Sequence, residues 1–349
     1  MKTSYDKNDV ILLLKDITGL IKPMSTQERE KLIQIGRHYS EMLPIEYTPS
    51  SQYMTVYNQV LELYSDEVAN AIGNLSDEII TQKGKNIVLV SLARAGTPIG
   101  ILIKRYIKFK YNIDTPHFSI SIIRGKGIDD NAMKYLLSKY SAEKLLFVDG
   151  WIGKGAILNE LKKAVSLYKN VSSDIAVVAD PANVTELCGT HQDILIPSSC
   201  LNSTVSGLIS RTFLREDIIG KNDFHGALYY EELKPYDLSY EFISEVERHF
   251  KINNVKDTAI IDGYGIDEVK KIAEEFYIKD INFIKPGIGE TTRVLLRRVP
   301  HLILIDEKYK NSVQLQHIVK LSEEKNVPIQ YYNLNHYKCC GIIKNLSDI

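Results

Sequence analysis

The sequence contains few cysteines and no long apolar run. Four cysteines occur among 349 residues, and the positions of Cys188, Cys200, Cys339 and Cys340 show no paired spacing. A disulfide framework is therefore not expected, and the thiols should be reduced. The N-terminal residues lack the apolar core of a secretory signal, and no apolar run is long enough to span a bilayer. We expect a cytoplasmic protein that does not contact a membrane.

The sequence also lacks an excess of charge of either sign. Lysine and arginine number 43, aspartate and glutamate number 44, and the formal net charge is -1. Binding of nucleic acid through bulk charge is thereby excluded, so any such contact must be a local patch. With 44% hydrophobic and 25% charged residues, the composition is that of an ordinary globular protein. The length suffices for two domains.

Short apolar runs that are typical of strands recur through the first two thirds of the chain. They lie at 87–92, 118–123, 145–148, 175–179 and 194–196, with helical patterns between several of them. This alternation predicts an α/β fold with a parallel sheet that is covered on both faces. Residues 1–45 are predicted to be helical, and residues 53–82 to form one long helix or a helix pair.

A second alternation follows a polar segment at 251–257. Strands are predicted at 259–261, 281–284, 302–305 and 329–332, with helices at 267–277, 290–298 and 313–325 between them. This is the size of a small α/β domain. We therefore place the first domain, with its helical N-terminal extension, at 1–250 and the second at 255–349.

A glycine loop after the third apolar run is the most informative motif. Four apolar residues lead to Asp149, and an amphipathic helical pattern begins at Ile157. The pattern indicates a buried strand, a loop and a helix start, whose unpaired N–H groups can hold a phosphate. Asp149 can accept a sugar hydroxyl or a metal-bound water. The loop is neither a Walker A loop nor G-x-G-x-x-G. The candidate phosphate-binding residues in it are Gly150, Ile152, Gly153, Lys154 and Gly155.

Two further turns follow predicted strands. In the first, 91–100, Arg94 can hold a diphosphate oxygen, and the backbone of Ala95, Gly96 and Thr97 can form an anion-binding turn. In the second, 124–129, glycines flank two cations that can close over a charged substrate, Arg124 and Lys126. The ends of parallel strands meet at one edge of a sheet. Each turn alone is common in α/β proteins, but three in this order favour a phosphate site.

Together these turns resemble those of a type I phosphoribosyltransferase. The resemblance extends to a narrower bacterial family, through the segments His38–Glu46, Phe147–Ala156 and Leu201–Thr212. That family pairs a phosphoribosyltransferase-like domain with a C-terminal pelota-like RNA-binding domain. It carries the label cysteine protease StiP and is associated with stress operons of the tellurium-resistance type.

The resemblance implies an enzyme that binds Mg²⁺ and a phosphoribosyl diphosphate-like donor. The loop 150–155 would hold the 5′-phosphate and Asp149 the ribose hydroxyls, while Arg94 would hold the pyrophosphate. Arg124 and Lys126 would close over it. Mg²⁺ would keep mostly water and phosphate ligands, so no protein cage is expected. Ordinary phosphoribosyltransferases have two adjacent acidic residues before a Thr/Ser-rich loop, whereas here Gly150 and Trp151 follow Asp149.

The segment Lys285–Arg298 resembles the RNA-contacting turn of the pelota and kink-turn-binding fold, which reads Gly-x-Asn-Glu-x-x-Lys. Gly287, Glu290 and Arg293 fit this pattern, but Gly289 stands where the Asn would be. Loss of that base-reading side chain argues against kink-turn specificity. Backbone N–H groups with Lys285, Arg293 and Arg297 can still bind RNA phosphates. The alternative is a helix with a solvated basic face.

Other interpretations stay open at this point. A non-catalytic sensor of a nucleotide and RNA would use the same two sites. A cysteine hydrolase would need a base near Cys200, for which His191 and His225 are candidates. The segments 188–191 and 336–340 contain Cys and His, but they lack a standard zinc-finger spacing and fall in different domains. Trp151 has either a packing role or a stacking role against a base.

Overall fold

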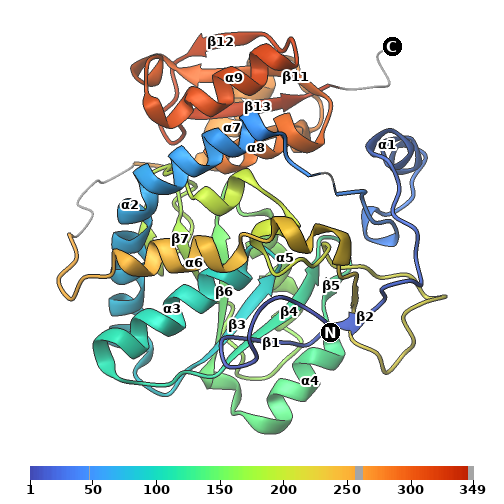
Figure 1. Cartoon of the computed structure of the whole chain (residues 1–349), viewed down its shortest axis with the longest axis vertical. Coiled ribbons are helices and arrows are strands. Elements are labelled where there is room, and N and C mark those ends of the chain that lie inside the picture. The colour runs from blue at the N-terminus through green and yellow to red at the C-terminus, as the bar shows by residue number, and fades with distance from the viewer. Residues whose placement is uncertain (47, 256–261, 345–349) are drawn as a thin grey trace.

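The protein is described by a computed structural model that covers residues 1–46, 48–255 and 262–344. Residues 1–255 form a large α/β body, and residues 262–344 form a smaller α/β domain that lies against one end of it (Figure 1). The predicted fold class is therefore confirmed, whereas the predicted domain limits at 250 and 255 stay a prediction. None of the described helices is both long and apolar enough to cross a membrane.

The body is built on a mainly parallel seven-stranded sheet. Its order is β1-β4-β3-β6-β7-β8, and β5 pairs with β4 in the antiparallel sense. The strands are β1 (Ile11–Leu12), β3 (Val88–Ala93), β4 (His117–Ile123), β5 (Gly127–Ile128), β6 (Leu145–Trp151), β7 (Ile175–Ala179) and β8 (Cys188–Thr190). Four of the five apolar runs predicted to be strands lie in this sheet.

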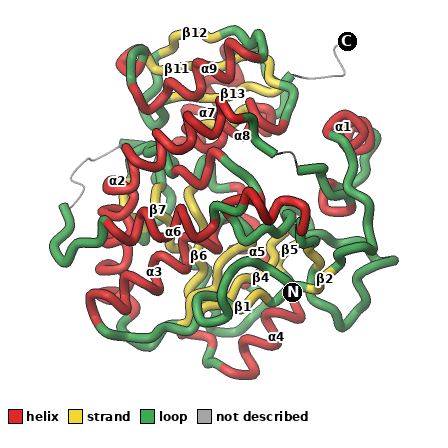
Figure 2. Tube along the Cα trace, in the orientation of Figure 1, coloured by secondary structure: helices red, strands yellow, loops and turns green. Residues whose placement is uncertain are grey.

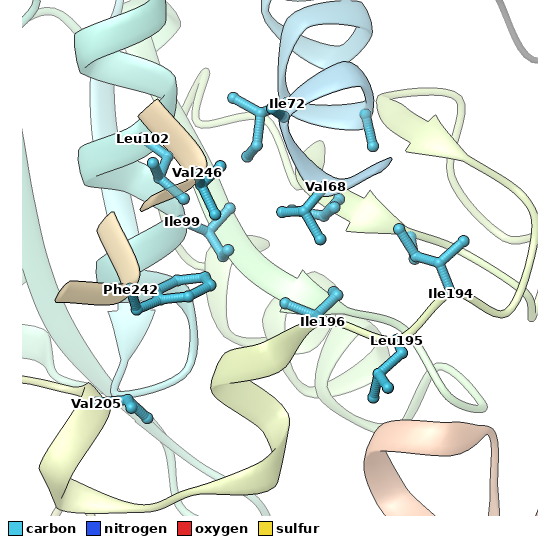
Figure 3. Packing of buried hydrophobic residues seen from close by; sticks show 14 of the residues in the cluster. Val68, Ile72, Ile99, Leu102, Ile194, Leu195, Ile196, Val205, Phe242 and Val246 are labelled. Carbon is cyan, nitrogen blue, oxygen red and sulfur yellow. The ribbon is translucent and has the colours of Figure 1, made fainter. Parts of the chain in front are cut away.

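Helices cover both faces of the sheet, because the strands are apolar on both sides (Figure 2). One face carries α2 (Ser51–Lys83), α3 (Gly96–Tyr111) and α6 (Ser239–Arg248). Figure 3 shows how Ile72 of α2, Ile99 of α3 and Phe242 of α6 meet there. The other face carries α4 (Asp130–Lys139) and α5 (Ala156–Val165). The predicted long helix at 53–82 is confirmed as the single helix α2.

The smaller domain has a four-stranded sheet in the order β10-β13-β11-β12. Its elements are α7 (Gly265–Glu275), β10 (Ile284–Pro286), α8 (Ile288–Arg297), β11 (Pro300–Asp306), α9 (Gln316–Glu324), β12 (Ile329–Tyr332) and β13 (Cys339–Ile343). Side chains of α7 pack on one face of this sheet. Side chains of α8 and α9 belong to the same hydrophobic cluster as α2 and α3 of the body. The two domains therefore share one continuous core.

Some predicted elements were wrong. Residues 1–45 contain mainly loops, the short strands β1 and β2 (Lys15–Asp16), and one helix, α1 (Thr26–Gln34). β2 pairs with β9 (Gly226–Ala227). The run at 194–196 is a buried loop whose side chains enter the core, and the outer strand is β8 instead (Figure 3). An apolar run records burial, which a loop can share with a strand.

The second alternation was partly right. A 3-10 turn (Ile281–Phe283) precedes β10, and another (Val313–Leu315) precedes α9. The central strand β13 was not predicted. The predicted strand at 259–261 lies outside the described residues.

Candidate functional site

A cavity of about 840 Å³ lies between the body and the smaller domain. The ends of β3 and β6 form one wall, and the start of α8 with β10 forms another. Ligands of parallel sheets bind at such strand ends. The polar and charged residues on its walls include Arg94, Arg124, Asp149 and Lys154 of the body, and Lys285, Glu290 and Arg293 of the smaller domain.

Two helix N-termini face this cavity. Helix α5 begins after Gly155, whose φ of 83° is favourable for glycine, and α3 begins after Ala95. In the described structure, no side chain caps either helix start. The first N–H groups of a helix and its dipole favour an anion. Gly96 lets the start of α3 pack closely against β6, because a Cβ there would lie 2.3 Å from the carbonyl oxygen of Val148.

Asp149 lies near the end of β6 and is half-buried on the cavity wall. Its carboxylate accepts a 2.8 Å hydrogen bond from the N–H of Gly150. Burial raises the pKa of Asp149 to about 6, although the nearby Arg293 opposes the shift. The carboxyl group therefore changes charge close to neutral pH.

Arg94 is held in place on the wall by the body itself. Its guanidinium donates to Oε1 of Glu46 at 2.9 Å and to the carbonyl oxygen of Ile209 at 2.7 Å. The side chain is only 11% exposed. The peptide bond between Ala93 and Arg94 is cis. A ligand anion at Arg94 would share this cation with Glu46.

Lys154 connects the glycine loop to the smaller domain. Its Nζ donates to the carbonyl oxygens of Ile281 at 2.6 Å and Ile284 at 2.9 Å. Burial lowers the pKa of Lys154 to about 8, and the nearby Lys285 and Arg124 add to this effect. Lys154, which is predicted to bind a phosphate, therefore lies on the cavity wall, but its ammonium group already donates to two acceptors.

Trp151 packs against the smaller domain. The guanidinium of Arg293 lies over its ring at 4.5 Å. A Cβ at Gly289 would lie 2.9 Å from the indole. Gly289 therefore lets α8 lie on the tryptophan, and this packing accounts for a glycine where the RNA-binding pattern has Asn. This contact is the packing role considered for Trp151, whereas its stacking role against a base stays a prediction.

A carboxylate of the body accepts a hydrogen bond at the start of α8. Asp193 accepts hydrogen bonds from the N–H of Ile288 at 3.0 Å and the N–H of Lys338 at 2.9 Å. Burial raises the pKa of Asp193 to about 6. The turn that resembles an RNA-contacting element thus has a protein anion at its N-terminus. Nothing in the sequence around Asp193 indicated this contact.

The two cations that were expected to close over the substrate differ in position. Arg124 lines the cavity and donates to Oδ1 of Asn282 at 2.8 Å. Lys126 is exposed and does not line it. The N–H groups of Gly125 and Gly127 donate to the carboxylate of Glu160 on α5, at 2.7 and 3.0 Å. In this structure, the loop is therefore tied to α5.

The remaining predicted residues lie around the cavity or behind it. Thr97 is buried and shares a 2.8 Å hydrogen bond with Ser119. Glu290 pairs with Arg293 at 3.1 Å. The side chain of Arg297 lies outside the described part of the structure. The other predicted residues on the cavity wall are Ala95, Ile152, Gly153 and Gly155.

Cys200 and the candidate bases are not brought together. Cys200 is 2% exposed, and burial raises the pKa of its thiol to about 12. Tyr53 donates to its carbonyl oxygen at 2.7 Å. His225 shares a 2.8 Å hydrogen bond with Ser121. Within the described residues, no group of three side chains suited to a metal occurs.

His191 pairs with another cysteine. Its Nε2 lies 3.4 Å from Sγ of Cys188. The Cys-x-x-His spacing of this pair is visible in the sequence, but it does not match a zinc-finger spacing.

Comparisons with known proteins agree with this two-domain arrangement. The sequence model of a family described as tellurite-like stress resistance cysteine protease StiP matches residues 3–247, and that of a PELOTA RNA binding domain matches residues 264–345. A protein of Acinetobacter baylyi named cysteine protease StiP is 33% identical over 367 residues, which cover 99% of this chain and 94% of that protein.

Solved structures give weaker matches. A hypoxanthine-guanine phosphoribosyltransferase of Bacillus anthracis matches 36% of this chain and 77% of its own, with 17% identity and a TM-score of 0.28. A hypoxanthine-guanine-xanthine phosphoribosyltransferase matches 49% of this chain and 93% of its own, with 15% identity and a TM-score of 0.25. These scores are too low to carry an argument about this chain.

Proposed function

The chain belongs to the family of tellurite-like stress resistance cysteine protease StiP. From the geometry of its interdomain cavity, we propose that it binds a phosphoribosyl diphosphate-type ligand. One observation carries the proposal. Three cations, Arg124, Lys154 and Lys285, line the same cavity, and the pKa of Lys154 is lowered first by burial and then by the nearby Lys285 and Arg124. Like charges crowded beside two helix N-termini are stabilised by a bound polyanion.

Different residues of the cavity bind different parts of the proposed ligand. The start of α5 receives the 5′-phosphate, and the start of α3 with Arg94 receives the diphosphate. Asp149 accepts a hydrogen bond from a ribose hydroxyl or from a metal-bound water. Because no cluster of three metal-binding side chains occurs within the described residues, Mg²⁺ would be held mainly by phosphate and water, and it would neutralise charge on a departing diphosphate. Transfer of the phosphoribosyl group to an acceptor is the proposed activity.

Calorimetry with phosphoribosyl diphosphate and Mg²⁺ tests the site. Asp149→Asn should weaken binding by about tenfold or more, since a charge-assisted hydrogen bond contributes about 1.5–3 kcal/mol. Lys169→Ala is the matched control, because this exposed cation does not line the cavity. Absence of binding to the unaltered protein, or equal affinity in Asp149→Asn, would remove the proposal. Release of pyrophosphate with turnover distinguishes a transferase from a non-catalytic sensor.

A cysteine hydrolase is the second candidate, and the name of the Acinetobacter baylyi relative, cysteine protease StiP, favours it. Hydrolysis of an unfolded protein substrate, abolished by thiol alkylation, tests this activity. Cys200 is poorly suited to act as the nucleophile, since its thiol is buried with its pKa raised to about 12.

RNA binding by the smaller domain is proposed from the family match at 264–345. Contact through the start of α8 would require displacement of Asp193 and Trp151. We therefore propose that RNA binding and domain docking compete.

A further inference from the structure

The outer strand of the main sheet carries a thiol beside an imidazole. Cys188 is the first residue of β8, and His191 follows directly after the strand. The turn brings Nε2 of His191 to 3.4 Å from Sγ of Cys188. Gly189, between them, allows α2 to pack closely, because a Cβ there would lie 2.3 Å from the carbonyl oxygen of Ala71. The main-chain packing of β8 thus fixes the position of this pair.

The hydrogen bonds of His191 determine its tautomer. Nδ1 lies 3.1 Å from the carbonyl oxygen of Asp180. A carbonyl oxygen only accepts, so Nδ1 carries the proton, and in the neutral ring Nε2 directs its lone pair at the thiol. This is the arrangement in which a histidine removes a proton from a cysteine.

Asp180 adds a carboxylate behind the ring. Its Oδ2 lies 3.8 Å from Nδ1 of His191 and accepts hydrogen bonds from the N–H groups of Val184 at 2.6 Å and Thr185 at 2.8 Å. Among the residues that the structure describes, its Oδ1 is buried without a hydrogen-bond partner. These bonds hold the carboxylate in position, where it stabilises a protonated His191.

Access distinguishes this pair from the imidazole–hydroxyl pairs of the described chain, in which Ser40, Ser91, Ser121 and Thr292 are each 0% exposed. The imidazoles of His117 and His317 also contact hydroxyl groups, at 2.7 Å from Ser91 and 2.8 Å from Thr292. Both of these histidines are at most 3% exposed, so no substrate reaches them. The His191 side chain is 32% exposed, and Cys188 is half-buried.

We infer that Cys188, His191 and Asp180 form a second catalytic site, distinct from the cavity, that transfers acyl groups from peptide amides to water. This inference rests on the hydrolase proposed above and assigns its nucleophile to Cys188 rather than Cys200. Cys188 is the catalytic nucleophile, His191 the base and acid, and Asp180 the positioning residue.

The reaction balances with water as the second substrate. Cys188 passes its proton to Nε2 of His191, and the thiolate sulfur bonds to the amide carbon. The C–N bond breaks, and the amine leaves with the proton from Nε2, so that a thioester remains. A water molecule gives a proton to Nε2 and attacks the thioester. The carboxylic acid departs, and the proton returns to sulfur.

Alkylation by iodoacetamide, followed residue by residue with mass spectrometry, tests the site without a substrate. The full chain is compared with His191→Asn, whose amide N–H can still donate to the Asp180 carbonyl although the base at Nε2 is gone. At about pH 7, an ordinary thiol is only a few per cent thiolate, so His191→Asn should slow alkylation of Cys188 about tenfold. At about pH 9.5, alkylation of Cys188 no longer depends on a base to remove the thiol proton, so the rates in the unaltered protein and in His191→Asn should converge.

Cys200→Ser is the matched control and should leave the rate at Cys188 unchanged. Equal rates for the unaltered protein and His191→Asn at about pH 7 would overturn the inference, as would a tenfold gap that persists at about pH 9.5, which indicates altered access. Peptide hydrolysis that survives Cys188→Ser would overturn it while leaving the hydrolase proposal intact. Absence of hydrolysis in the unaltered protein, with a reactive Cys188, would overturn the hydrolase proposal and the acyl-transfer role together.

Discussion

The carboxylate of Asp193 accepts a 3.0 Å hydrogen bond from the N–H of Ile288, across the junction between the two domains. The same carboxylate accepts from the N–H of Lys338 at 2.9 Å. An anion at a helix N-terminus is favourable, and here a side chain of the protein provides it. The end of α8 that resembles a phosphate-binding element is therefore already satisfied by the body.

Replacing this carboxylate should favour RNA. Asp193→Ala leaves the N–H groups at the start of α8 without their anion, so we expect the full chain to bind a short hairpin RNA several-fold more tightly. Fluorescence anisotropy of labelled RNA at two salt concentrations measures this, and affinity should fall with salt. Asp217→Ala, which removes the same charge from an exposed site, is the control. Equal affinities in all three proteins would contradict competition between docking and RNA.

The pKa of Asp149 predicts a pH dependence of ligand binding. Because its folded pKa is raised to about 6, the folded state holds the proton more tightly than an unfolded chain with a pKa of about 3.9. If the carboxylate accepts ribose hydroxyls, affinity should fall as the pH drops through about 6. Calorimetry between about pH 5 and about pH 8 measures the slope, which should be smaller in Asp149→Asn. An identical slope in both proteins would assign it to the ligand's phosphates.

The same shift predicts a change in stability. A raised pKa contributes stability below about pH 3.9, and this contribution is lost as the pH rises through about 6. At about pH 7.5, Asp149→Asn should be as stable as the unaltered protein or more stable, by up to about 3 kcal/mol. Urea unfolding at several pH values measures this. A large loss of stability would show that the ionised carboxylate supports the fold.

Gly289 should not tolerate the Asn that the RNA-binding pattern prefers. The new Cβ would lie 2.9 Å from the indole of Trp151, so Gly289→Asn should destabilise the protein by about 1–3 kcal/mol. The double variant with Trp151→Ala should recover part of this loss, because the obstacle is gone. A thermodynamic cycle from urea midpoints gives the coupling energy. Additive effects would mean that the two residues do not oppose each other.

The thiols of Cys188 and Cys200 should respond differently to substitution. Cys200→Ser places a hydroxyl in a site that is 2% exposed, so stability should fall by about 1–3 kcal/mol, while any hydrolysis should persist. Cys188→Ser should abolish hydrolysis with little change in stability, since this residue is half-buried at the sheet edge. Melting curves and rates measured on the same samples separate the two effects.

Local pattern was sufficient for the regular elements of the fold. β7 and α2 have apolar residues in clear runs or at helical spacing, and their ends were found to within two residues. β8 could not be found in this way, because Cys-Gly-Thr has no apolar alternation. The apolar run at 194–196 was misleading, because its burial comes from packing under α2 and α3 rather than from a strand ladder.

The contacts that define the cavity depend on tertiary structure. Asp193 and Ile288 are 95 residues apart, and Lys154 finds its acceptors 127 and 130 residues away. The sequence shows the glycine loop and the basic segment Lys285–Arg298 separately, but it does not show that they face each other. The Cys188 and His191 pair is local and was visible, whereas the orientation that Asp180 gives to the imidazole was not.

The tryptophan at the domain junction is the single tryptophan of the chain. Its ring is covered by Arg293 and the backbone of α8, and it also lines the cavity. Although the chain also contains 21 tyrosines, its tryptophan fluorescence originates from one place, where both domains and any ligand meet. Separation of the domains would expose the indole to water and shift its emission to longer wavelength. The molecule thus contains its own optical probe of domain docking, at a junction where an added label would prevent the two domains from packing together.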